Sequence, residues 1–279
     1  MLKTKLQHIL RRYGLYDRFK ESFAYDFYRY LRQGRPLRWR HNEAVSYRSL
    51  FGELPRDMLV FDVGAHRGQR TDVFLKLGAR VVAVEPDALN QRFLARKYSR
   101  SRLRKKTVTI VNKAVSDTTS GAVMWVHLPG SGLNSLSSKW VRTLERDEKR
   151  FGNVVTFVGS RNVETVTIES LIDSFGAPFY IKIDVEGHEP SVLRGLRRAV
   201  PYLSFEVNLP EFLPEGIECV EMLGRLAKDG RFNLSCDFHR GLALSEWLDA
   251  TEVASVLSGC HAPSVEVFWK SGRAAFPAD

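Results

Sequence analysis

The chain has 279 residues, of which 44% are hydrophobic and 11% aromatic, which is ample apolar material for a packed core. Disorder is therefore excluded as the default state. The cysteines Cys219, Cys236 and Cys260 are widely separated, which excludes a disulfide framework and a CxxC metal site. The N-terminus lacks the apolar block of a signal peptide, and no segment has the ~18 uninterrupted apolar residues that span a bilayer, so we expect a soluble, cytoplasmic protein.

The formal net charge of +10 is unevenly distributed along the chain. Residues 1–40 contain eleven Lys and Arg against three acidic residues, a net charge of +8, and residues 92–106 contain eight basic residues and no acid. Such polarity is typical of proteins that contact nucleic acid, an anionic membrane surface or a phosphorylated acceptor. Solvated helix faces that keep the protein soluble are an equally weighted alternative.

Residues 1–50 are expected to form an N-terminal helical extension, because apolar and aromatic residues recur there at spacings of three and four. The spacing is clearest between Leu15 and Leu31. From Met58 onward the pattern changes to short apolar runs separated by helical stretches. We therefore divide the chain into this extension and one domain of residues 51–279.

Seven short apolar runs in this domain have the length and composition of strands. They lie at residues 58–63, 80–85, 107–112, 178–184, 202–208, 231–236 and 265–270. Because helical stretches alternate with them, the sequence predicts an α/β fold with a mostly parallel seven-stranded sheet and helices on both faces. The longest interruption, residues 121–167, is predicted to form a β-hairpin and, at residues 130–140, a mobile polar loop near the ligand crevice. A helix is also predicted at residues 245–257.

The first run ends in a glycine-containing turn, DVGAHRG at residues 62–68, before a helix that is expected to begin near Thr71. Glycines at such a turn let the backbone approach a ligand at the carboxyl edge of a parallel sheet. The second run ends in Glu85, whose carboxylate can accept hydrogen bonds from both ribose hydroxyls of an adenosine. The Gly-x-Gly-x-x-Gly pattern of a dinucleotide-dependent oxidoreductase, the rival that uses the same crevice, is not met. The turn therefore favours an adenosine cofactor without a pyrophosphate, namely S-adenosylmethionine.

Residues 178–189, PFYIKIDVEGHE, place charged side chains within and just beyond an apolar strand. In a strand Lys182 and Asp184 point to the same face, and a lysine inside a sheet requires a paired charge. Glu206 stands near the carboxyl end of the next run. If the two strands are neighbours, Asp184 and Glu206 would form a carboxylate pair at the crevice.

The sequence resembles the FkbM family of S-adenosylmethionine-dependent methyltransferases over residues 51–234. The segments that carry the resemblance are DVGAHRG at residues 62–68, Glu85-Pro86-Asp87, and IKIDVEGHE with VLRG after it at residues 181–195. The resemblance implies that residues 51–279 adopt the Rossmann-like class I methyltransferase fold, with an antiparallel last strand. It also implies O-methylation of a sugar, glycolipid or related metabolite. His66 departs from the family, which commonly has Asn at this position.

The resemblance also implies a set of cofactor contacts by position. The residues so implied are Asp62, Gly64, Ala65, His66, Gly68, Glu85, Pro86, Ala114, Val115 and Asp184. Gly64 and Gly68 would lie against the cofactor, and Glu85 would bind its ribose. Ala114 and Val115 would flank the adenine, although packing at a strand end explains Val115 equally well.

Methyl transfer to a hydroxyl requires an aligned acceptor and removal of its proton. Asp184, Glu186 and His188 are the candidate bases, and Lys182 and Glu206 complete the predicted catalytic set. As an alternative, Asp184 and Glu206 would bind Mg²⁺, which lowers the pKa of the acceptor. In a purely structural alternative, Lys182 and Asp184 form an ion pair and Glu186 caps the helix that begins near Pro190.

The acceptor is expected to be a small molecule or a glycan, and Asn134, Ser135 and Ser137 of the 130–140 loop are candidates to bind it. A basic nucleic-acid-binding protein is the competing hypothesis from another class, but no stacking-aromatic motif supports it. Docking of the basic N-terminus on an anionic membrane is favoured over contact with nucleic acid. The histidines show no metal-ligand spacing, and the patterns do not specify an oligomeric state.

Overall fold

A computed structural model describes residues 35–99, 107–146 and 155–272. Its central element is a seven-stranded sheet. In spatial order the strands are β3 (Val108–Val111), β2 (Arg80–Val84), β1 (Leu59–Val63), β7 (Tyr180–Ile183), β8 (Tyr202–Asn208), β10 (Ser264–Lys270) and β9 (Arg231–Ser235). Neighbouring strands are parallel except β10, which runs antiparallel to β8 and β9. The mostly parallel sheet and its antiparallel last strand are therefore confirmed.

The central strands are buried on both faces, which explains their continuous apolar runs in the sequence. Every residue of β1 and of β7 is buried. Val63, the last residue of β1, lies level with Val84 at the end of β2 and with Ile183 at the end of β7. The segments that follow these three strands therefore meet at one edge of the sheet, where ligands of such folds bind.

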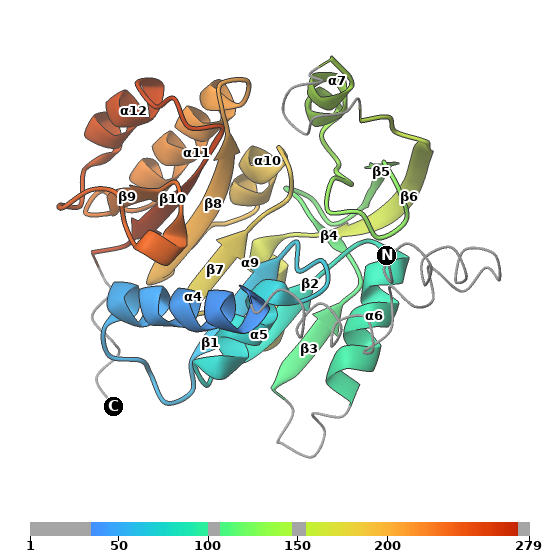
Figure 1. Ribbon diagram of the computed structural model, residues 1–279, viewed down its shortest axis with the longest axis horizontal. Helices are drawn as coiled ribbons and strands as arrows, with labels where there is room; N and C mark the ends of the chain where they lie inside the picture. Colours follow the sequence, from blue (N-terminus) through green and yellow to red (C-terminus); the bar gives the residue numbers. More distant parts are fainter. Residues whose placement is uncertain (1–34, 100–106, 147–154, 273–279) are drawn as a thin grey trace, which may run out of the picture.

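Helices cover both faces of the sheet (Figure 1). One face packs against α4 (Arg35–Phe51), α5 (Gln69–Lys76) and α6 (Ala88–Tyr98), and the other against α9 (Ile168–Phe175), α10 (Glu189–Arg194), α11 (Leu213–Leu226) and α12 (Ala250–Ser258). Of the predicted N-terminal helical extension, residues 1–34 lie outside the described residues. Its remaining part, α4, contributes Tyr47 and Phe51 to a buried aromatic cluster with Tyr180 of β7.

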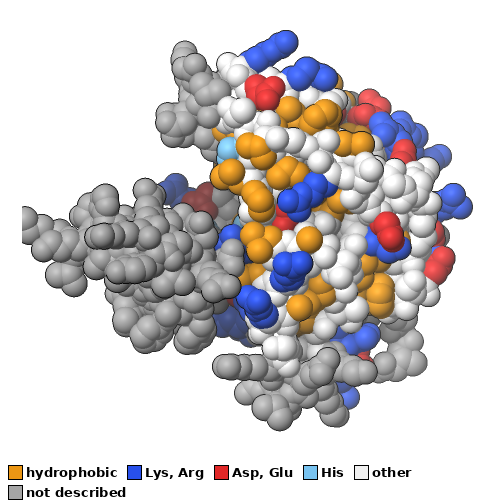
Figure 2. Space-filling view, turned by 90° about the vertical axis from the view of Figure 1, so that its right-hand side faces the viewer, with side chains coloured by type: hydrophobic (Ala, Val, Ile, Leu, Met, Phe, Trp, Pro, Cys, Tyr) orange, Lys and Arg blue, Asp and Glu red, His pale blue; other side chains and the backbone are white. Residues whose placement is uncertain are grey.

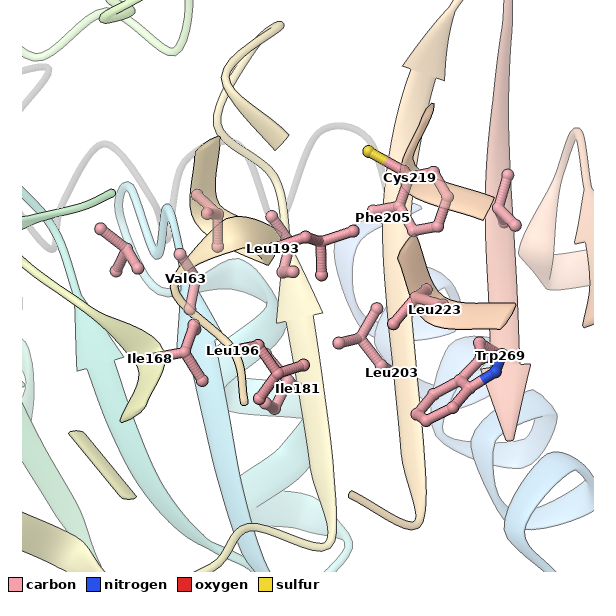
Figure 3. Packing of buried hydrophobic residues seen from close by; sticks show 14 of the residues in the cluster. Val63, Ile168, Ile181, Leu193, Leu196, Leu203, Phe205, Cys219, Leu223 and Trp269 are labelled. Atoms are coloured by element: carbon pink, nitrogen blue, oxygen red, sulfur yellow. The ribbon is translucent and has the colours of Figure 1, made fainter. Parts of the chain in front are cut away.

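The larger hydrophobic core lies between the sheet and helices α9 to α12. Figure 3 shows how Ile181 and Leu203 project from neighbouring strands toward side chains of α10 and α11, among them Leu193 and Leu223. All four side chains are buried, and full burial of such a side chain contributes about 1.5–3 kcal/mol to stability. This packing holds β7 rigidly in place, so the residues that follow it are well supported.

The long insertion forms the predicted hairpin. Strands β5 (Gly121–Val126) and β6 (Gly159–Val166) pair antiparallel, and β6 also pairs with β4 (Ala114–Val115) in a small three-stranded sheet. Helix α7 (Ser138–Arg146) lies between β5 and β6 in the sequence. The side of the molecule that carries this insertion exposes hydrophobic side chains among Lys and Arg side chains (Figure 2).

The helix predicted at residues 245–257 begins later than expected. Leu248 forms an isolated β-bridge with Phe232 of β9, which extends the chain at this point. Asp249 then caps α12 in a capping box with Glu252. A short 3-10 helix, η2 (Phe238–Arg240), precedes this segment. Among the described residues, the helices are too short or too polar to cross a membrane.

Candidate functional site

The turn after β1 requires glycine because other parts of the chain approach it closely. Gly64 and Gly68 have positive φ angles of 82° and 71°. A Cβ atom on Gly64 would overlap the carbonyl oxygen of Asp184, and one on Gly68 would overlap the hydroxyl of Tyr98. The backbone N–H groups of Gly64 and Ala65 both donate to the carbonyl of Val84, at 3.0 Å. The turn is therefore locked against β2 and against the segment after β7.

Glu85 directly follows β2 and orders the residues around it. Its Oε2 accepts a hydrogen bond of 2.8 Å from the backbone N–H of His66, and its Oε1 accepts one of 2.8 Å from the N–H of Asp87. Glu85 is 5% exposed, and burial raises the pKa of its carboxyl to about 7. The carboxylate of Glu85 therefore holds the turn after β1, residues 64–68, which we call the cofactor turn. The charge of this carboxylate changes near neutral pH.

The segment after β7 carries the other charged groups. Glu186 adopts a positive φ of 55°, which is uncommon for a residue with a side chain. The carboxylate of Glu189 accepts hydrogen bonds of 3.2 Å from the N–H groups of Val185 and Gly187. Glu189, and not Glu186 as the structural alternative expected, therefore binds the backbone at the start of α10. Glu186 instead lines the cleft that is described next.

These segments line a cleft that is partly open to solvent. The predicted site residues that line it are Gly64, His66, Glu85, Pro86, Ala114, Val115, Asp184, Glu186 and His188. The cleft therefore brings together the cofactor turn, the end of β2, the small strand β4 and the segment after β7. Other predicted site residues are not among those that line the cleft, and these are Asp62, Ala65, Gly68, Lys182 and Glu206.

Three of these residues, Asp62, Lys182 and Glu206, are charged residues within the strands that lead to the cleft. Asp62 is buried and accepts a hydrogen bond from the Thr71 hydroxyl at 2.5 Å; its pKa is raised to about 6 by burial. Lys182 lies 3.5 Å from the Asp184 carboxylate, as the predicted ion pair requires. Glu206 stands on β8, which is the neighbour of β7 as the carboxylate-pair hypothesis required. Burial raises the pKa of Glu206 to about 7.

Loop 128–137 of the insertion closes the cleft on its outer side. The Asp87 carboxylate accepts hydrogen bonds from Gly130 N–H and Asn134 Nδ2, at 3.2 and 3.1 Å. His66 Nε2 lies 3.0 Å from the carbonyl of Gly130. On the opposite lip, the hydroxyl of Ser135 donates to the carbonyl of Glu186 at 2.7 Å. The loop lies near the crevice as predicted, and it is attached to both the cofactor turn and the segment after β7.

The predicted polar residues of this loop have mixed positions. Asn134 and Ser135 line the cleft, although each already binds protein groups. Ser137 accepts a hydrogen bond from the N–H of Trp140 at the start of α7. Asp87 was part of a motif, but its roles in capping α6 and in anchoring the loop were missed.

Asn90 is a site residue that the sequence analysis missed. It lines the cleft beside Glu85, is 1% exposed, and its Oδ1 has no hydrogen-bond partner among the described residues. A buried acceptor without a donor is costly in free energy, so Asn90 is able to accept a hydrogen bond from a group bound in the cleft. Its only sequence signal is its position two residues after the start of α6. An Asn in the first turn of a helix does not by itself indicate a binding site.

Burial shifts the pKa values of His66, His188 and Glu186. It lowers the pKa of His66 and of His188, so both imidazoles are neutral at pH 7. His188 Nε2 lies 3.1 Å from the hydroxyl of Ser116. Burial, reinforced by the charge of Asp184, raises the pKa of Glu186 well above its usual value. Within residues 35–99, 107–146 and 155–272, no three His, Cys, Asp or Glu side chains are grouped as metal ligands.

Comparison with solved structures finds similarity to several methyltransferases, each with a TM-score below 0.5. A precorrin-6y C5,15-methyltransferase from Geobacter metallireducens has 11% identity and a TM-score of 0.43, with 84% of this chain and 86% of that chain covered. A TehB-like SAM-dependent methyltransferase from Corynebacterium glutamicum has 10% identity and a TM-score of 0.42, with 86% and 97% covered. The plantazolicin methyltransferase BpumL in complex with SAH has 10% identity and a TM-score of 0.39, with 91% and 90% covered.

Sequence comparison identifies the family. No curated protein matches the chain. The model of the methyltransferase FkbM domain matches residues 62–228, which is more than half of the chain. The match begins at Asp62, within β1, and includes the turn after β1 and the segment after β7, so it contains the elements that build the cleft. The chain therefore belongs to the FkbM family of S-adenosylmethionine-dependent methyltransferases.

Proposed function

We propose that the protein is an O-methyltransferase that acts on a hydroxyl of a sugar, glycolipid or related metabolite. The observation that supports the proposal is that Asp184, Glu186 and His188 line the same cleft as Gly64 of the glycine turn. A hydroxyl must lose its proton as the methyl group arrives, whereas a neutral amine attacks with its free electron pair. Proton-binding side chains beside the methyl donor therefore favour an oxygen acceptor.

The residues at the inner end of the cleft fit S-adenosylmethionine. Gly64 lines the cleft without a side chain, so its backbone can contact the cofactor directly. Glu85 has acceptor capacity for the ribose hydroxyls in addition to its two backbone bonds. Asn90 offers a buried, unpaired oxygen to a donor of the nucleoside. These three residues would hold the adenosine part, with Ala114 and Val115 at its side.

The segment after β7 would carry out the proton chemistry. S-adenosylmethionine, when bound, supplies an electrophilic methyl group on a positively charged sulfur. The neutral imidazole of His188 takes the proton of the acceptor hydroxyl, because burial lowers the pKa of this ring. Burial raises the pKa of the Glu186 carboxyl, which favours its protonated form, and in that form Glu186 would donate a hydrogen bond to the acceptor. Asp184 lines the same cleft and would lie toward the sulfonium of the bound cofactor.

The outer wall of the cleft suits a hydroxylated organic acceptor. Met124 and Leu136 provide apolar surface, and Lys113 and Ser131 provide polar groups. Ring faces of sugars and similar metabolites pack on apolar side chains while their hydroxyls bind polar ones. The mixed wall therefore supports a glycan or glycolipid acceptor.

The proposal is tested by measuring binding and transfer separately. Calorimetry with S-adenosylmethionine and S-adenosylhomocysteine is expected to show binding of both. Methyl-labelled cofactor is then incubated with oligosaccharides, glycolipids, RNA and protein, and products are treated with mild alkali. Methyl ethers survive this treatment and methyl esters do not, and mass spectrometry locates the methylated oxygen.

The variant His188→Gln is expected to bind the cofactor normally and to transfer methyl groups more than about 100-fold more slowly, as for loss of a general base. The substitution His261→Gln, on an exposed histidine outside the cleft, serves as the control. Label that appears only on RNA or protein would refute the proposed acceptor class.

A further inference from the structure

A buried chain of polar side chains lies beneath the cleft. Lys182 is 1% exposed in the middle of the sheet. Its Nζ lies 3.5 Å from Oδ2 of Asp184 and 3.5 Å from Oε1 of Glu266. Asp184 lines the cleft, whereas Glu266 belongs to β10, two strands away from β7. Lys182 therefore connects a carboxylate at the cleft to a more buried carboxylate on β10.

Glu266 is itself held firmly. The hydroxyl of Ser204 donates to its Oε1 at 2.6 Å, and the Ser204 hydroxyl lies 2.5 Å from that of Tyr180. Tyr180 continues the chain to the hydroxyl of Tyr47 in α4, at 3.4 Å. Tyr47, Tyr180 and Ser204 are all completely buried. The carboxylate of Glu266 therefore has a fixed position from which it attracts Lys182.

A lysine held by one carboxylate would move toward it and neutralise it. Here the ammonium stands at equal distances from two carboxylates, and fields are strong in a buried site. The attraction of Glu266 keeps Lys182 away from full contact with Asp184. Asp184 can then direct its negative charge into the cleft.

We propose that Glu266 is a positioning residue that, through Lys182, keeps the Asp184 carboxylate oriented and charged toward the sulfonium of the bound cofactor. This inference rests on the role of Asp184 in the proposed function. Glu266 lies outside residues 62–228, which match the family model. It is therefore a feature of this chain that the family match does not include.

The test compares two ligands that differ in charge at sulfur. S-adenosylmethionine carries a sulfonium and S-adenosylhomocysteine a neutral thioether, so the ratio of their dissociation constants reports the charge that faces the sulfur. We expect Glu266→Gln to shift this ratio by about tenfold against S-adenosylmethionine, the scale of one hydrogen bond to a charged group. Affinity for S-adenosylhomocysteine should stay within about twofold, and Glu266→Asp should restore most of the preference.

Matched variants separate positioning from stability. Glu221→Gln makes the same chemical change at an exposed helix position. Within the described residues Glu221 forms an ion pair with the exposed Arg225, so this variant should leave the ratio unchanged. Ser204→Ala removes one hydrogen bond to Glu266 without a change in charge. It should shift the ratio in the same direction by a smaller factor, and it serves as the second probe if Glu266→Gln does not fold.

The outcomes distinguish this inference from the proposed function. Asp184→Asn must shift the ratio, and the double variant with Glu266→Gln must add nothing further, because both act through one group. Equal loss of affinity for both ligands in Glu266→Gln would overturn the inference, as would an unchanged ratio. Methyl transfer to a non-hydroxyl acceptor would refute the proposed function and leave this binding test intact.

Discussion

At the residue scale, the two glycines of the cofactor turn show how tightly the cleft is built. Gly64 stands against the Asp184 carbonyl and Gly68 against the Tyr98 hydroxyl. From the sequence alone, both glycines are explained by the close approach of a ligand to the backbone. The structure adds a second cause, which is contact with the protein itself. This explains why Gly68 is absent from the residues that line the cleft.

The substitution Gly64→Ala is expected to destabilise the fold by about 3 kcal/mol or more, because a strained φ and an overpacked contact add together. Gly78→Ala is the matched control, because Gly78 also has a positive φ and a Cβ there meets nothing within 4 Å. The control should lose only about 1–2 kcal/mol. Urea denaturation of both variants measures the difference. Equal losses would show that the contact with Asp184 is unimportant.

The charge of Glu85 makes cofactor affinity depend on pH. Its pKa of about 7 means that the carboxyl is mostly protonated at pH 6 and mostly ionised at pH 8. Ribose hydroxyls donate more strongly to the ionised form, so affinity should rise about three- to tenfold over this range. Calorimetry at pH 6, 7 and 8 measures the rise, and Glu85→Gln should remove it. A wild-type affinity that does not change with pH would contradict the ribose contact.

The same group has the opposite effect on stability. The pKa of Glu85 is raised above its usual value in the folded protein, so the folded state binds more protons than the unfolded state. The stabilisation from the protonated carboxyl is present at acidic pH and is lost as the pH rises through about 7. Thermal denaturation of the ligand-free protein should therefore show a smaller fall in Tm between pH 5 and 8 in Glu85→Gln than in wild type.

At the scale of elements, loop 128–137 joins the two lips of the cleft. Both non-glycine residues with positive φ, His66 and Glu186, make hydrogen bonds to it within the described chain. Strained backbone persists where surrounding contacts hold it, and it concentrates at functional sites. The loop therefore stabilises the conformations of both lips.

Ser135→Ala should loosen this loop without disturbing the rest of the fold. It removes the hydrogen bonds to the carbonyls of Val185 and Glu186. We expect faster amide hydrogen exchange in residues 128–137 and faster dissociation of S-adenosylhomocysteine, measured by mass spectrometry and stopped flow. Ser138→Ala is the control. Among the described residues, the Ser138 hydroxyl accepts a hydrogen bond only from the exposed side chain of Arg142. Unchanged exchange in the loop would show that Ser135 does not anchor it.

The elements were more predictable from the sequence than the contacts between them. Buried parallel strands appear as apolar runs, so all seven strands of the sheet were placed correctly. Glu266 could not be found, because its link to Lys182 depends on how β10 inserts between β8 and β9. Asp62 and Glu206 lie near the carboxyl ends of their strands, as expected, but they are not among the residues that line the cleft. Which side chains line a cleft depends on the neighbouring loops. The late start of α12 depends on a β-bridge between Leu248 and Phe232. Local sequence patterns do not indicate such a contact between separate segments.

At the scale of the whole molecule, the uneven charge predicts contact with an anionic surface. Residues 1–40 carry a net charge of +8, and basic segments gain about 1 kcal/mol per Lys or Arg near an anionic membrane. We expect the full-length protein to float with liposomes that contain anionic lipid and not with neutral ones. Binding should weaken as salt is raised, because the charges are screened. Equal flotation with both liposomes would remove the proposal of membrane docking.

The placement of β10 has a consequence for synthesis of the chain. This strand, residues 264–270, follows both β8 and β9 in the sequence, yet it lies between them in the sheet. While the chain emerges from the ribosome, β8 therefore keeps an unpaired edge until β10 has been made. Exposed strand edges pair readily with other chains. The nascent chain is thus open to aggregation through this edge until β10 is available, and slower translation of the segment between β8 and β10 would prolong that interval.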